Sequence, residues 1–508
     1  MKKIPILTIL LAGIVTFSCS KKTPEIANTI PDDAFLVASF NPQQLFEKGQ
    51  ISSMDAFIGK IDQELIRSIL KEPAKSGIDL GEYAFVYSYF IDEEPIFGLT
   101  AVLEDQDKFA ANMKELLNEK VNNLITEEEY TMLVPDHGDG CLAWNDEQVI
   151  FLSSPDKDLN GDRMKEQLLK LFGLTKEDAI TSVVDFNDFA GKMEDMNVWF
   201  TGDQFKEVLE KSGAMKEMKI DLPLELYNNY GQIFISYDKG AMNIHGETHL
   251  SDDVAKVTET FLVAKDNLNK DMLKLAPGND LILAMAYGLD LDRATRLMKN
   301  FMPPEMDSMG GKLEETLGIG GEELLEALSG DFVVAVNGAA EGSMIPVEVM
   351  IGIGIKDETI QEKFMENMGD KLPIENQGDF FLINIQGNEI YSGIINNIWV
   401  ITNAKGYKDA VTGKGLEKSL LDSKFNDYAN GSMGMYMNLD VTSYPSTLQG
   451  MIGSGGAPEM LELITESLSF IGIESTNLES NALLKTANDD ENSLYTLLQM
   501  MEKAAEHH

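Results

Sequence analysis

The chain has 508 residues, enough for two or three domains, and 44% hydrophobic with 25% charged residues is a composition that excludes a disordered chain. With 84 Asp and Glu against 41 Lys and Arg, the net charge of −43 argues against nucleic acid as a partner. Two cysteines exclude both a disulfide scaffold and a cysteine-based metal cluster.

Residues 1–18 have the pattern of a lipoprotein signal peptide. Two lysines precede the apolar run Ile4–Phe17, which is too short to span a membrane, and Cys19 follows at the expected cleavage point. This arrangement resembles the lipobox of bacterial lipoproteins, although Phe17-Ser18 replaces the usual small pair. We therefore expect Cys19 to be acylated and to attach the chain to a lipid bilayer, with residues 19–29 as a tether that holds the acidic body off the membrane. The alternative is an ordinary secretory signal with an incidental cysteine.

Strands and amphipathic helices alternate along the first half of the body. Period-two runs rich in aromatic and β-branched residues predict strands, and apolar residues at helical spacing predict helices. The predicted strands are Phe35–Phe40, Tyr83–Phe90, Ile96–Leu103, Gln148–Leu152, Val198–Thr201, Gln232–Tyr237 and Met242–Leu250, and the predicted helices are Met54–Lys71, Gln106–Asn118, Asp162–Phe172, Gln204–Lys211 and Asp253–Leu268. Short turns between neighbouring strands indicate antiparallel hairpins, so we expect an α+β fold with mainly antiparallel sheet.

One loop has the spacing of a calcium site. Asp156, Asp158 and Asn160 stand at alternate positions before a glycine, as in the first half of an EF-hand loop, and Asp162 adds a fourth oxygen donor. A glutamine stands at the twelfth position instead of a bidentate glutamate, and a strand precedes the loop. The alternative is a polar turn that caps the helix Asp162–Phe172.

A second candidate metal site lies on the predicted strand Met242–Leu250. His245, Glu247 and His249 alternate along it, so their side chains should share one face, and these are ligands that zinc or iron accepts. Three such positions on a straight strand extend over about 13 Å, too far for one ion. A solvated polar strand face is therefore the preferred interpretation.

The sequence repeats itself at an interval of about 240 residues. Six segments recur in the same order with slowly changing offsets, which predicts two homologous tandem halves at 30–265 and 276–503, joined by the polar segment Lys265–Pro277. The pairs are Pro31–Phe40 with Pro277–Ala286, Tyr83–Tyr87 with Gly330–Val334, Lys108–Met113 with Lys363–Met368, Glu147–Ser153 with Asn397–Asn403, Phe186–Ala190 with Phe425–Ala429, and Asn243-Ile244 with Asn477-Leu478. Local coincidence is the alternative explanation.

The opening of the body, Ile30–Gly49 (IPDDAFLVASFNPQQLFEKG), follows the lipoprotein signal directly. Together with the chain length, it resembles the exported bacterial lipoproteins catalogued as domain-of-unknown-function family 4836. The resemblance implies an exported, anchored α+β protein over nearly the whole mature chain. It supplies no activity and no catalytic residues.

No catalytic residue can be assigned from the sequence, which has neither a nucleophile elbow nor a phosphate-binding loop. We therefore expect an anchored envelope lipoprotein with a non-catalytic binding or structural role and with a protein, peptide or glycan ligand. Ser20 after the cysteine favours the outer membrane by resemblance to other lipoproteins, on either of its faces. No cofactor is expected apart from calcium at Asp156. The alternative is an envelope hydrolase, metal-assisted or carboxylate-based, because 84 acidic residues offer many carboxylate pairs.

Overall fold

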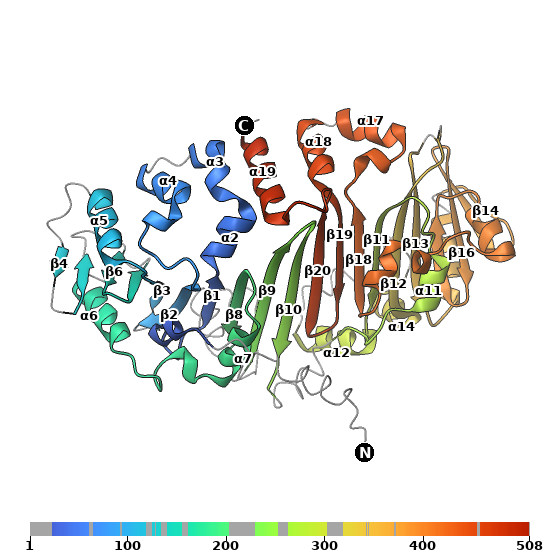
Figure 1. Ribbon diagram of the computed structural model, residues 1–508. Helices are drawn as coiled ribbons and strands as arrows, with labels where there is room; N and C mark the ends of the chain where they lie inside the picture. Colours follow the sequence, from blue (N-terminus) through green and yellow to red (C-terminus); the bar gives the residue numbers. More distant parts are fainter. Residues whose placement is uncertain are drawn as a thin grey trace, which may run out of the picture. The chain divides into compact units, whose positions relative to one another are not determined.

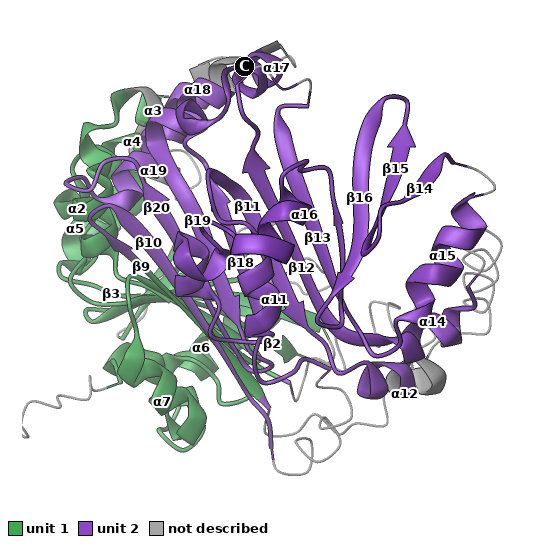
Figure 2. Ribbon diagram, turned by 90° about the vertical axis from the view of Figure 1, so that its right-hand side faces the viewer, with its two compact units in different colours: residues 1–201, 230–236 green, residues 202–229, 237–508 purple. Residues whose placement is uncertain are grey.

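The protein is described here from a computed structural model (Figure 1). The described residues are 23–59, 64–91, 94–117, 124–126, 129–133, 140–154, 161–202, 229–251, 263–301, 319–341, 343, 345–369, 372–454 and 458–506. The chain forms two compact units, unit 1 with residues 1–201 and 230–236 and unit 2 with residues 202–229 and 237–508 (Figure 2). Helices combine with antiparallel strands in both units, which confirms the predicted α+β class.

The sheet of unit 1 is entirely antiparallel. In the order in which they pair, its strands are β4 (Leu124–Thr126), β5 (Thr131–Leu133), β6 (Gly140–Trp144), β7 (Gln148–Ser153), β3 (Glu94–Val102), β2 (Ala84–Ile91), β1 (Leu36–Phe40), β8 (Met196–Thr201) and β9 (Tyr230–Asp238). Successive side chains along each strand point to opposite faces of the sheet, and buried side chains lie on both faces. Strand β1 lies in the centre, where Val37 pairs with Tyr87 on one side and Trp199 on the other.

Helices pack on both faces of this sheet. Helix α5 (Gln106–Leu117) covers one face, where the ring of Phe109 meets Trp144 edge-on at 5.5 Å. Helices α6 (Gly161–Phe172) and α7 (Val184–Lys192), with the short helix η1 (Glu25–Thr29), cover the face that carries Phe85, Tyr87 and Tyr89. The remaining helical segments of unit 1 are α2 (Pro42–Gly49), η2 (Ile51–Ser53), α3 (Asp55–Gly59), α4 (Glu64–Lys71), η3 (Pro73–Lys75) and η5 (Ile180–Ser182).

Local sequence explains where the elements begin and end. Asn41 caps α2 by accepting a hydrogen bond from the backbone of Gln44 at 3.0 Å, and Pro42 occupies the first helical position, where its missing N–H costs nothing. The helix ends at Gln50, which adopts a left-handed backbone conformation (φ 47°). A partly buried ion pair then holds α2 against the start of β8, since Lys48 Nζ lies 2.6 Å from the almost fully buried carboxylate of Asp195.

The sheet of unit 2 is also antiparallel. Its strands in spatial order are β10 (Ala241–His249), β20 (Glu479–Thr486), β19 (Leu468–Ser475), β18 (Met433–Asn438), β11 (Leu281–Gly288), β12 (Leu328–Gly338), β13 (Val347–Ile355), β17 (Ile398–Thr402), β16 (Asn388–Ile395), β15 (Phe380–Ile385) and β14 (Ile374–Asn376). Strand β11 occupies the position that β1 has in unit 1, because it pairs with both β12 and β18.

Two apolar clusters cover the faces of the unit 2 sheet. Helix α15 (Thr359–Gly369) packs on one of them, where Phe364 meets Trp399 edge-on at 5.3 Å. Helix α11 (Lys270–Leu275) and the segment around Phe425 cover the other. The remaining helical segments are α12 (Leu291–Phe301), α14 (Gly321–Ala327), α16 (Tyr407–Asp409), η7 (Ala410–Lys414), η8 (Leu420–Asp422), η9 (Lys424–Tyr428), η10 (Val441–Ser443), α17 (Ser446–Ser454), α18 (Pro458–Ser467) and α19 (Ser493–Glu506).

Two segments that the sequence analysis assigned to a tether and a linker belong to the cores. In the expected tether 19–29, η1 buries Ile26 and Ala27 in unit 1. In the expected linker Lys265–Pro277, α11 buries Met272 and Leu273 in unit 2. Both predictions were wrong at these residues, because two adjacent apolar side chains in a polar run are enough to anchor one helical turn.

The limits of the units also differ from the expected ranges 30–265 and 276–503. Strand β10 groups with unit 2 because it pairs with β20 along seven residues, from Ala241 with Lys485 to Glu247 with Glu479.

All seven predicted strands are present, within three residues at each end. Strands β4, β5 and β6 and helices α2 and α7 were not predicted, and the predicted helix Asp253–Leu268 is irregular over its described part, residues 263–268. None of the described helices has the length and apolar character needed to cross a membrane.

Candidate functional site

A cavity of about 530 Å³ lies in unit 1 beside the segment Ile30–Gly49, which we call the opening motif. Its wall comes from three places in the sequence: the opening motif, the end of β2, and the last turn of α6 with the loop that follows. We call it the opening cavity and define it by its polar and aromatic lining residues, which are Asp32, Asp33, Tyr89, Phe90, Gln167, Lys170 and Asp178. Its volume is in the range of small-molecule binding sites.

Backbone pairing fixes the opening motif against the chain that follows α6. The N–H of Ile180 donates to the carbonyl of Ile30 at 2.8 Å, and the N–H of Asp32 donates to the carbonyl of Asp178 at 3.0 Å. Ile30 and Ile180 are fully buried, so this short ladder is anchored in the core. As a result, Asp32, Asp33 and Asp178 are held together at the wall of the cavity although they are far apart in the sequence.

The opening cavity has an excess of negative charge. Among the described residues, the carboxylates of Asp32, Asp33 and Asp178 line it together with the ammonium group of Lys170. Burial and the neighbouring carboxylate of Asp32 raise the pKa of Asp33 above its ordinary value, and Lys170 and the backbone of Asp33 only partly oppose this. The shift means that burial makes the ionised form of Asp33 less favourable than that of an exposed carboxylate.

Tyr89 supplies a polar group that has no hydrogen-bond partner in the described part of the chain. Its side chain is 4% exposed, and its hydroxyl has no hydrogen-bond partner among the described residues. Burial, with the charge of Asp33 as a second cause, raises the pKa of this hydroxyl, so it is neutral at physiological pH. A buried hydroxyl without a partner costs about 1–3 kcal/mol, so it calls for an explanation. Phe90, next in the strand, stacks on Phe35 at 4.9 Å and adds an aromatic surface.

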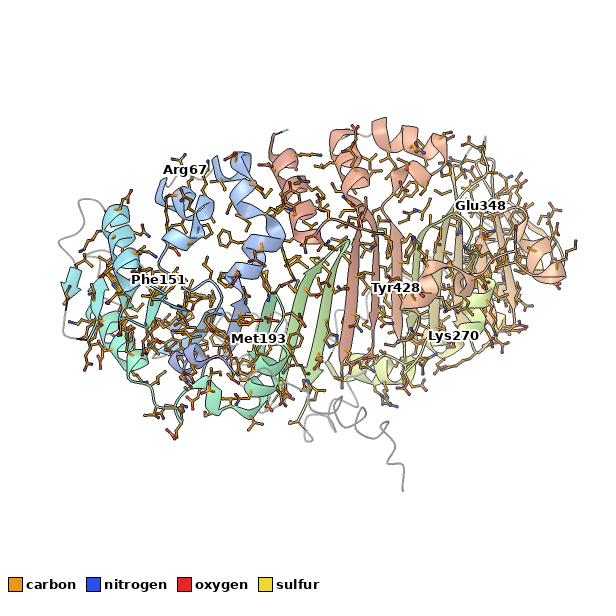
Figure 3. The ribbon with its side chains drawn as sticks, viewed as in Figure 1. Arg67, Phe151, Met193, Lys270, Glu348 and Tyr428 are labelled. Atoms are coloured by element: carbon orange, nitrogen blue, oxygen red, sulfur yellow. The ribbon has the colours of Figure 1, made fainter. Side chains whose placement is uncertain are left out.

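A second cavity, of about 470 Å³, lies in unit 2 and differs in its electrostatics. Glu348, labelled in Figure 3, lines it, and burial raises the pKa of its carboxyl. Glu389 is already satisfied, because Lys405 Nζ lies 3.0 Å from its Oε2 and the hydroxyl of Tyr391 donates to the same oxygen at 3.0 Å. This cavity therefore has a carboxylate whose charge the protein itself compensates.

The three candidate metal ligands on β10 form a chain of side-chain hydrogen bonds. His245, Glu247 and His249 share one face as predicted, with Glu247 Oε1 2.7 Å from His245 Nε2 and Glu247 Oε2 3.2 Å from His249 Nε2. Across the strand pair, Asn481 Oδ1 lies 2.6 Å from His245 Nδ1. Both ring nitrogens of His245 are therefore engaged. Among the described residues, no group of three or more His, Cys, Asp or Glu side chains is placed to hold a metal ion.

Burial lowers the pKa of His245, but its hydrogen bonds with Asn481 and Glu247 and the negative charges of Glu247 and Glu479 outweigh that effect, so the pKa is raised overall. The arrangement stabilises the protonated imidazole and makes this strand pair sensitive to pH.

The other predicted site residues lie at or beyond the limits of the described structure. Cys19, Asp156, Asp158 and Asn160 are outside the described residues, and Asp162 belongs to the first turn of α6 with its side chain undescribed. The second cysteine, Cys141 of β6, is buried, and burial raises the pKa of its thiol to about 11, so it is protonated at physiological pH.

The opening cavity was not predicted as a site, although its two adjacent aspartates were quoted as part of the opening motif. The only signal for this site in the sequence is the acidic pair Asp32-Asp33, which stands shortly before a buried strand. Tyr89, Lys170 and Asp178 come from separate elements, and only the tertiary fold brings them to the same wall.

The described fold and the cavity define an α+β protein with antiparallel sheets and a polar, acidic pocket at the start of its body. The chain belongs to the family described as Domain of unknown function (DUF4836), whose model matches residues 26–494. The match begins within η1, where the described core begins, and it confirms the family that the opening motif suggested.

No curated protein matches the sequence. Among solved structures, crystal forms I and IV of TP0453 are similar at 11% sequence identity, with TM-scores of 0.26 and 0.27. The first match covers 49% of this chain and 90% of TP0453, and the second covers 47% and 86%. Likeness at this level carries no argument about the function of this chain.

Proposed function

We propose that this chain is a lipid-anchored envelope protein with a non-catalytic binding role, and that the opening cavity is its binding site. The observation that carries the binding role is the cavity itself, with an acidic wall and a buried hydroxyl that has no partner among the described residues. The anchor rests on Cys19, which directly follows the apolar run Ile4–Phe17. Ser20 favours sorting to the outer membrane, on either of its faces.

The folded body begins very close to the proposed anchor. Thr23 is already described, and its hydroxyl donates to Asn187 Oδ1 of α7 at 2.7 Å. From Cys19 to Thr23 is four residues, which reach at most about 14 Å when fully extended. An acylated Cys19 would therefore hold the part of unit 1 around η1 and α7 near the bilayer surface, in place of a body held off by a long tether.

Replacing Cys19 by Ala tests the anchor. We expect Cys19→Ala to move from the membrane fraction to the soluble fraction, because several acyl chains are needed for stable attachment and this variant would carry none. Cys141→Ala is the matched control, since it makes the same chemical change at the buried cysteine and should stay with membranes. Retention of Cys19→Ala in washed membranes would contradict the proposal.

We also propose that the two units arose by duplication. Eight strand pairings support this proposal, since each pairing of unit 1 has a counterpart in unit 2 when ten is added to both strand numbers: β1–β2, β1–β8, β2–β3, β3–β7, β4–β5, β5–β6, β6–β7 and β8–β9. An unrelated pair of antiparallel sheets would not be expected to share the whole order. With the segments before β1 and β11 included, the repeats would start near Glu25 and Lys270.

Equivalent core positions give the duplication further support. At an offset of 246, the buried residues Ile26, Ala27 and Ile30 correspond to Met272, Leu273 and Ala276, which are also buried. The N–H of Leu420 donates to the carbonyl of Ala276 at 2.8 Å, as that of Ile180 does to Ile30. Phe186 and Phe425, paired by the sequence repeat, are both fully buried.

The strand pairing revises one of the sequence anchors. Phe85 is fully buried on β2, whereas Phe332 on β12 is partly exposed and its neighbour Val333 is fully buried. An offset of 248, one more than the sequence suggested, matches the buried faces of the two strands.

The alternative is a carboxylate-based hydrolase, and one observation favours it. Asp33, whose pKa is raised, lines the same cavity as Asp32, and glycoside hydrolysis uses two carboxyl groups of which one has a raised pKa. Release of nitrophenol from a panel of nitrophenyl glycosides, lost in Asp33→Asn, would favour the hydrolase over the binding protein.

A further inference from the structure

We infer that one face of the unit 1 sheet is a second binding site, which holds a membrane phospholipid by its acyl chains. The inference goes beyond the proposed function, whose site is the opening cavity, and it rests on that proposal only for the envelope location that supplies the lipid. It is carried by a continuous set of partly exposed apolar side chains, by their lack of charge, and by the flatness of the surface that they form.

The site, which we call the apolar floor, consists of two neighbouring rows of side chains on the face of the sheet that α5 covers at one end. Residues directly opposite each other on paired strands point to the same face, so the pairing register defines each row. One row contains Leu142, Phe151, Leu99, Val86, Ala38 and Val198, and the other contains Phe97, Leu36 and Phe200. Ser88 lies between Phe97 and Leu36, and its buried hydroxyl already donates to the carbonyl of Ile96 at 2.9 Å. None of these residues lines the opening cavity.

The apolar floor is exposed at strands whose opposite face is buried. Tyr87 and Leu152, which follow Val86 and Phe151 in their strands and point to the other face, are fully buried. Farther along the same strands, Trp144 is buried against Phe109 of α5. The four most exposed side chains of the apolar floor are Phe97 (47%), Phe151 (39%), Phe200 (38%) and Val86 (37%). Contiguous exposed apolar side chains of this kind mark a site of interaction.

Charge limits the class of occupant. The chain has a net charge of −43, yet all nine side chains of the apolar floor are hydrocarbon. A charged partner would find no ion pair there and would lose its hydration, whereas an acyl chain loses only unfavourable contact with water. The acidic body also repels an anionic head group, so we expect a phospholipid with a zwitterionic one.

The aromatic rings make the surface flat. The ring of Phe151, labelled in Figure 3, lies over Gly140 of β6, where a Cβ would clash with it. The ring of Phe200 lies in the same way over Gly231 of β9. Rings that lie along the sheet fill the spaces into which side chains of a docked helix would insert. Flexible acyl chains need no such spaces, because each methylene group gains from burial against any apolar surface.

The dimensions suit a lipid with two acyl chains. The longer row crosses six strands, from β6 to β8, and neighbouring strands lie about 4.8 Å apart, so the row extends over about 24 Å. The acyl chains of one leaflet extend over about 15 Å, half of the hydrocarbon core. The two rows are two residues apart along each strand, or about 7 Å, which is enough for two chains side by side.

Uptake of lipid from vesicles tests the inference. The mature chain from Ser20 to His508 contains every described residue and has no acylated cysteine, so it needs no detergent. It is incubated with vesicles of phosphatidylethanolamine and phosphatidylcholine, the vesicles are removed by flotation, and lipid in the protein fraction is measured by mass spectrometry. We expect stoichiometric phospholipid in this fraction, and less from vesicles of phosphatidylglycerol. Chain that floats with the vesicles and carries no lipid of its own would contradict the inference.

Variants locate the lipid. Val86→Glu should reduce bound phospholipid by about tenfold or more, because it places a carboxylate without a partner under the acyl chains. Val184→Glu makes the same change at a 73% exposed position of α7 and should leave uptake unchanged. Phe97→Ser adds no charge at the most exposed ring of the apolar floor, and it should reduce uptake by about threefold or more while the chain stays folded.

Three results would overturn the inference. They are a parent chain without phospholipid, an equal loss of uptake in Val86→Glu and Val184→Glu, and a dimer in sedimentation velocity that Val86→Glu dissociates, since a second copy would then cover the apolar floor. Asp33→Asn in the opening cavity should leave uptake unchanged. The assay does not involve Cys19, so failure of the apolar floor is distinguishable from failure of the anchor and of the opening cavity.

Discussion

His245 illustrates how a single residue can make a strand pair sensitive to pH. Its two ring nitrogens contact Asn481 on the neighbouring strand and Glu247 on its own strand, so its charge is coupled to the pairing of β10 with β20. The side chain is about a third exposed, and solvent therefore screens part of the interaction.

We predict that His245→Gln lowers the free energy of unfolding more at acidic than at alkaline pH. The pKa of His245 is raised in the folded protein, so its contribution is fully present below the unfolded value of about 6.5 and is lost as the pH rises through the folded value. Urea denaturation of parent and variant at about pH 5.5 and pH 8.5 measures the difference. In a Glu247→Gln background the pH-dependent part should shrink, and a difference that stays constant with pH would contradict the assignment.

The buried tyrosines show a limit of sequence reasoning at the residue scale. Aromatic and β-branched residues along Tyr83–Phe90 predicted the strand that contains Tyr87 and Tyr89. This pattern could not predict that Tyr89 would line a cavity together with Asp32 and Asp33, because that placement depends on the ladder between Ile30 and Ile180. The periodicity of a strand defines its faces but not what covers them.

At the scale of elements, glycines make room for aromatic rings that lie across neighbouring strands. Gly98 of β3 pairs directly with Tyr87 of β2, and a Cβ at Gly98 would lie 2.2 Å from the Tyr87 ring. Gly231 stands in the same relation to Phe200, where the distance would be 2.1 Å. Tyr428, labelled in Figure 3, lies over Gly472 of β19 in unit 2, at 2.0 Å from such a Cβ.

We predict that Gly98→Ala destabilises the protein by about 1–3 kcal/mol, because the added methyl group overpacks the core against Tyr87. Gly453→Ala is the control, since Gly453 lies in α17 with no atom within 4 Å of a Cβ, and alanine there should be neutral or stabilising by up to about 1 kcal/mol. Chemical denaturation of both variants checks this. Equal stabilities would mean that the Tyr87 ring can move aside without cost.

Elements with a long periodic pattern were predicted well, and short ones were not. Helices α5 and α6 have the predicted limits within one residue, because each has a continuous apolar stripe. Strands β4 and β5 have three residues each, too few for alternation to be recognised. Helix α11 was interpreted as linker because lysine and aspartate surround Met272 and Leu273, and only packing in unit 2 separates such a turn from a loop.

At the scale of the whole molecule, the proposed lipid anchor has to overcome electrostatic repulsion between the acidic body and the membrane. A net charge of −43 is repelled by an anionic leaflet, and the repulsion is screened over about 8 Å at physiological ionic strength. A connection of at most about 14 Å between Cys19 and Thr23 extends over less than two such lengths. The side of unit 1 that carries η1 and α7 would therefore lie within reach of the leaflet, and the free energy of several buried acyl chains must outweigh the repulsion.

The proposed duplication explains how one chain can hold a site in only one of two similar units. If the repeats share their strand order, Asn337 of unit 2 takes the position of Tyr89 and donates to the carbonyls of Pro277 and Asn279. The unit 1 wall has two aspartates and a tyrosine whose hydroxyl has no partner among the described residues. The repeat was predicted from six short segments, which include buried strands and the Phe186 and Phe425 core positions. The cavity was missed because the residues that form it differ between the repeats.

The most direct test of the account is mass spectrometry of the N-terminal peptide of the protein isolated from its native membranes. We predict that the mature chain begins at Cys19 and that this residue carries acyl groups, since signal cleavage and acylation at this cysteine are the basis of the proposed anchor. A chain that begins elsewhere, or an unmodified Cys19 in the membrane-bound protein, would contradict the account.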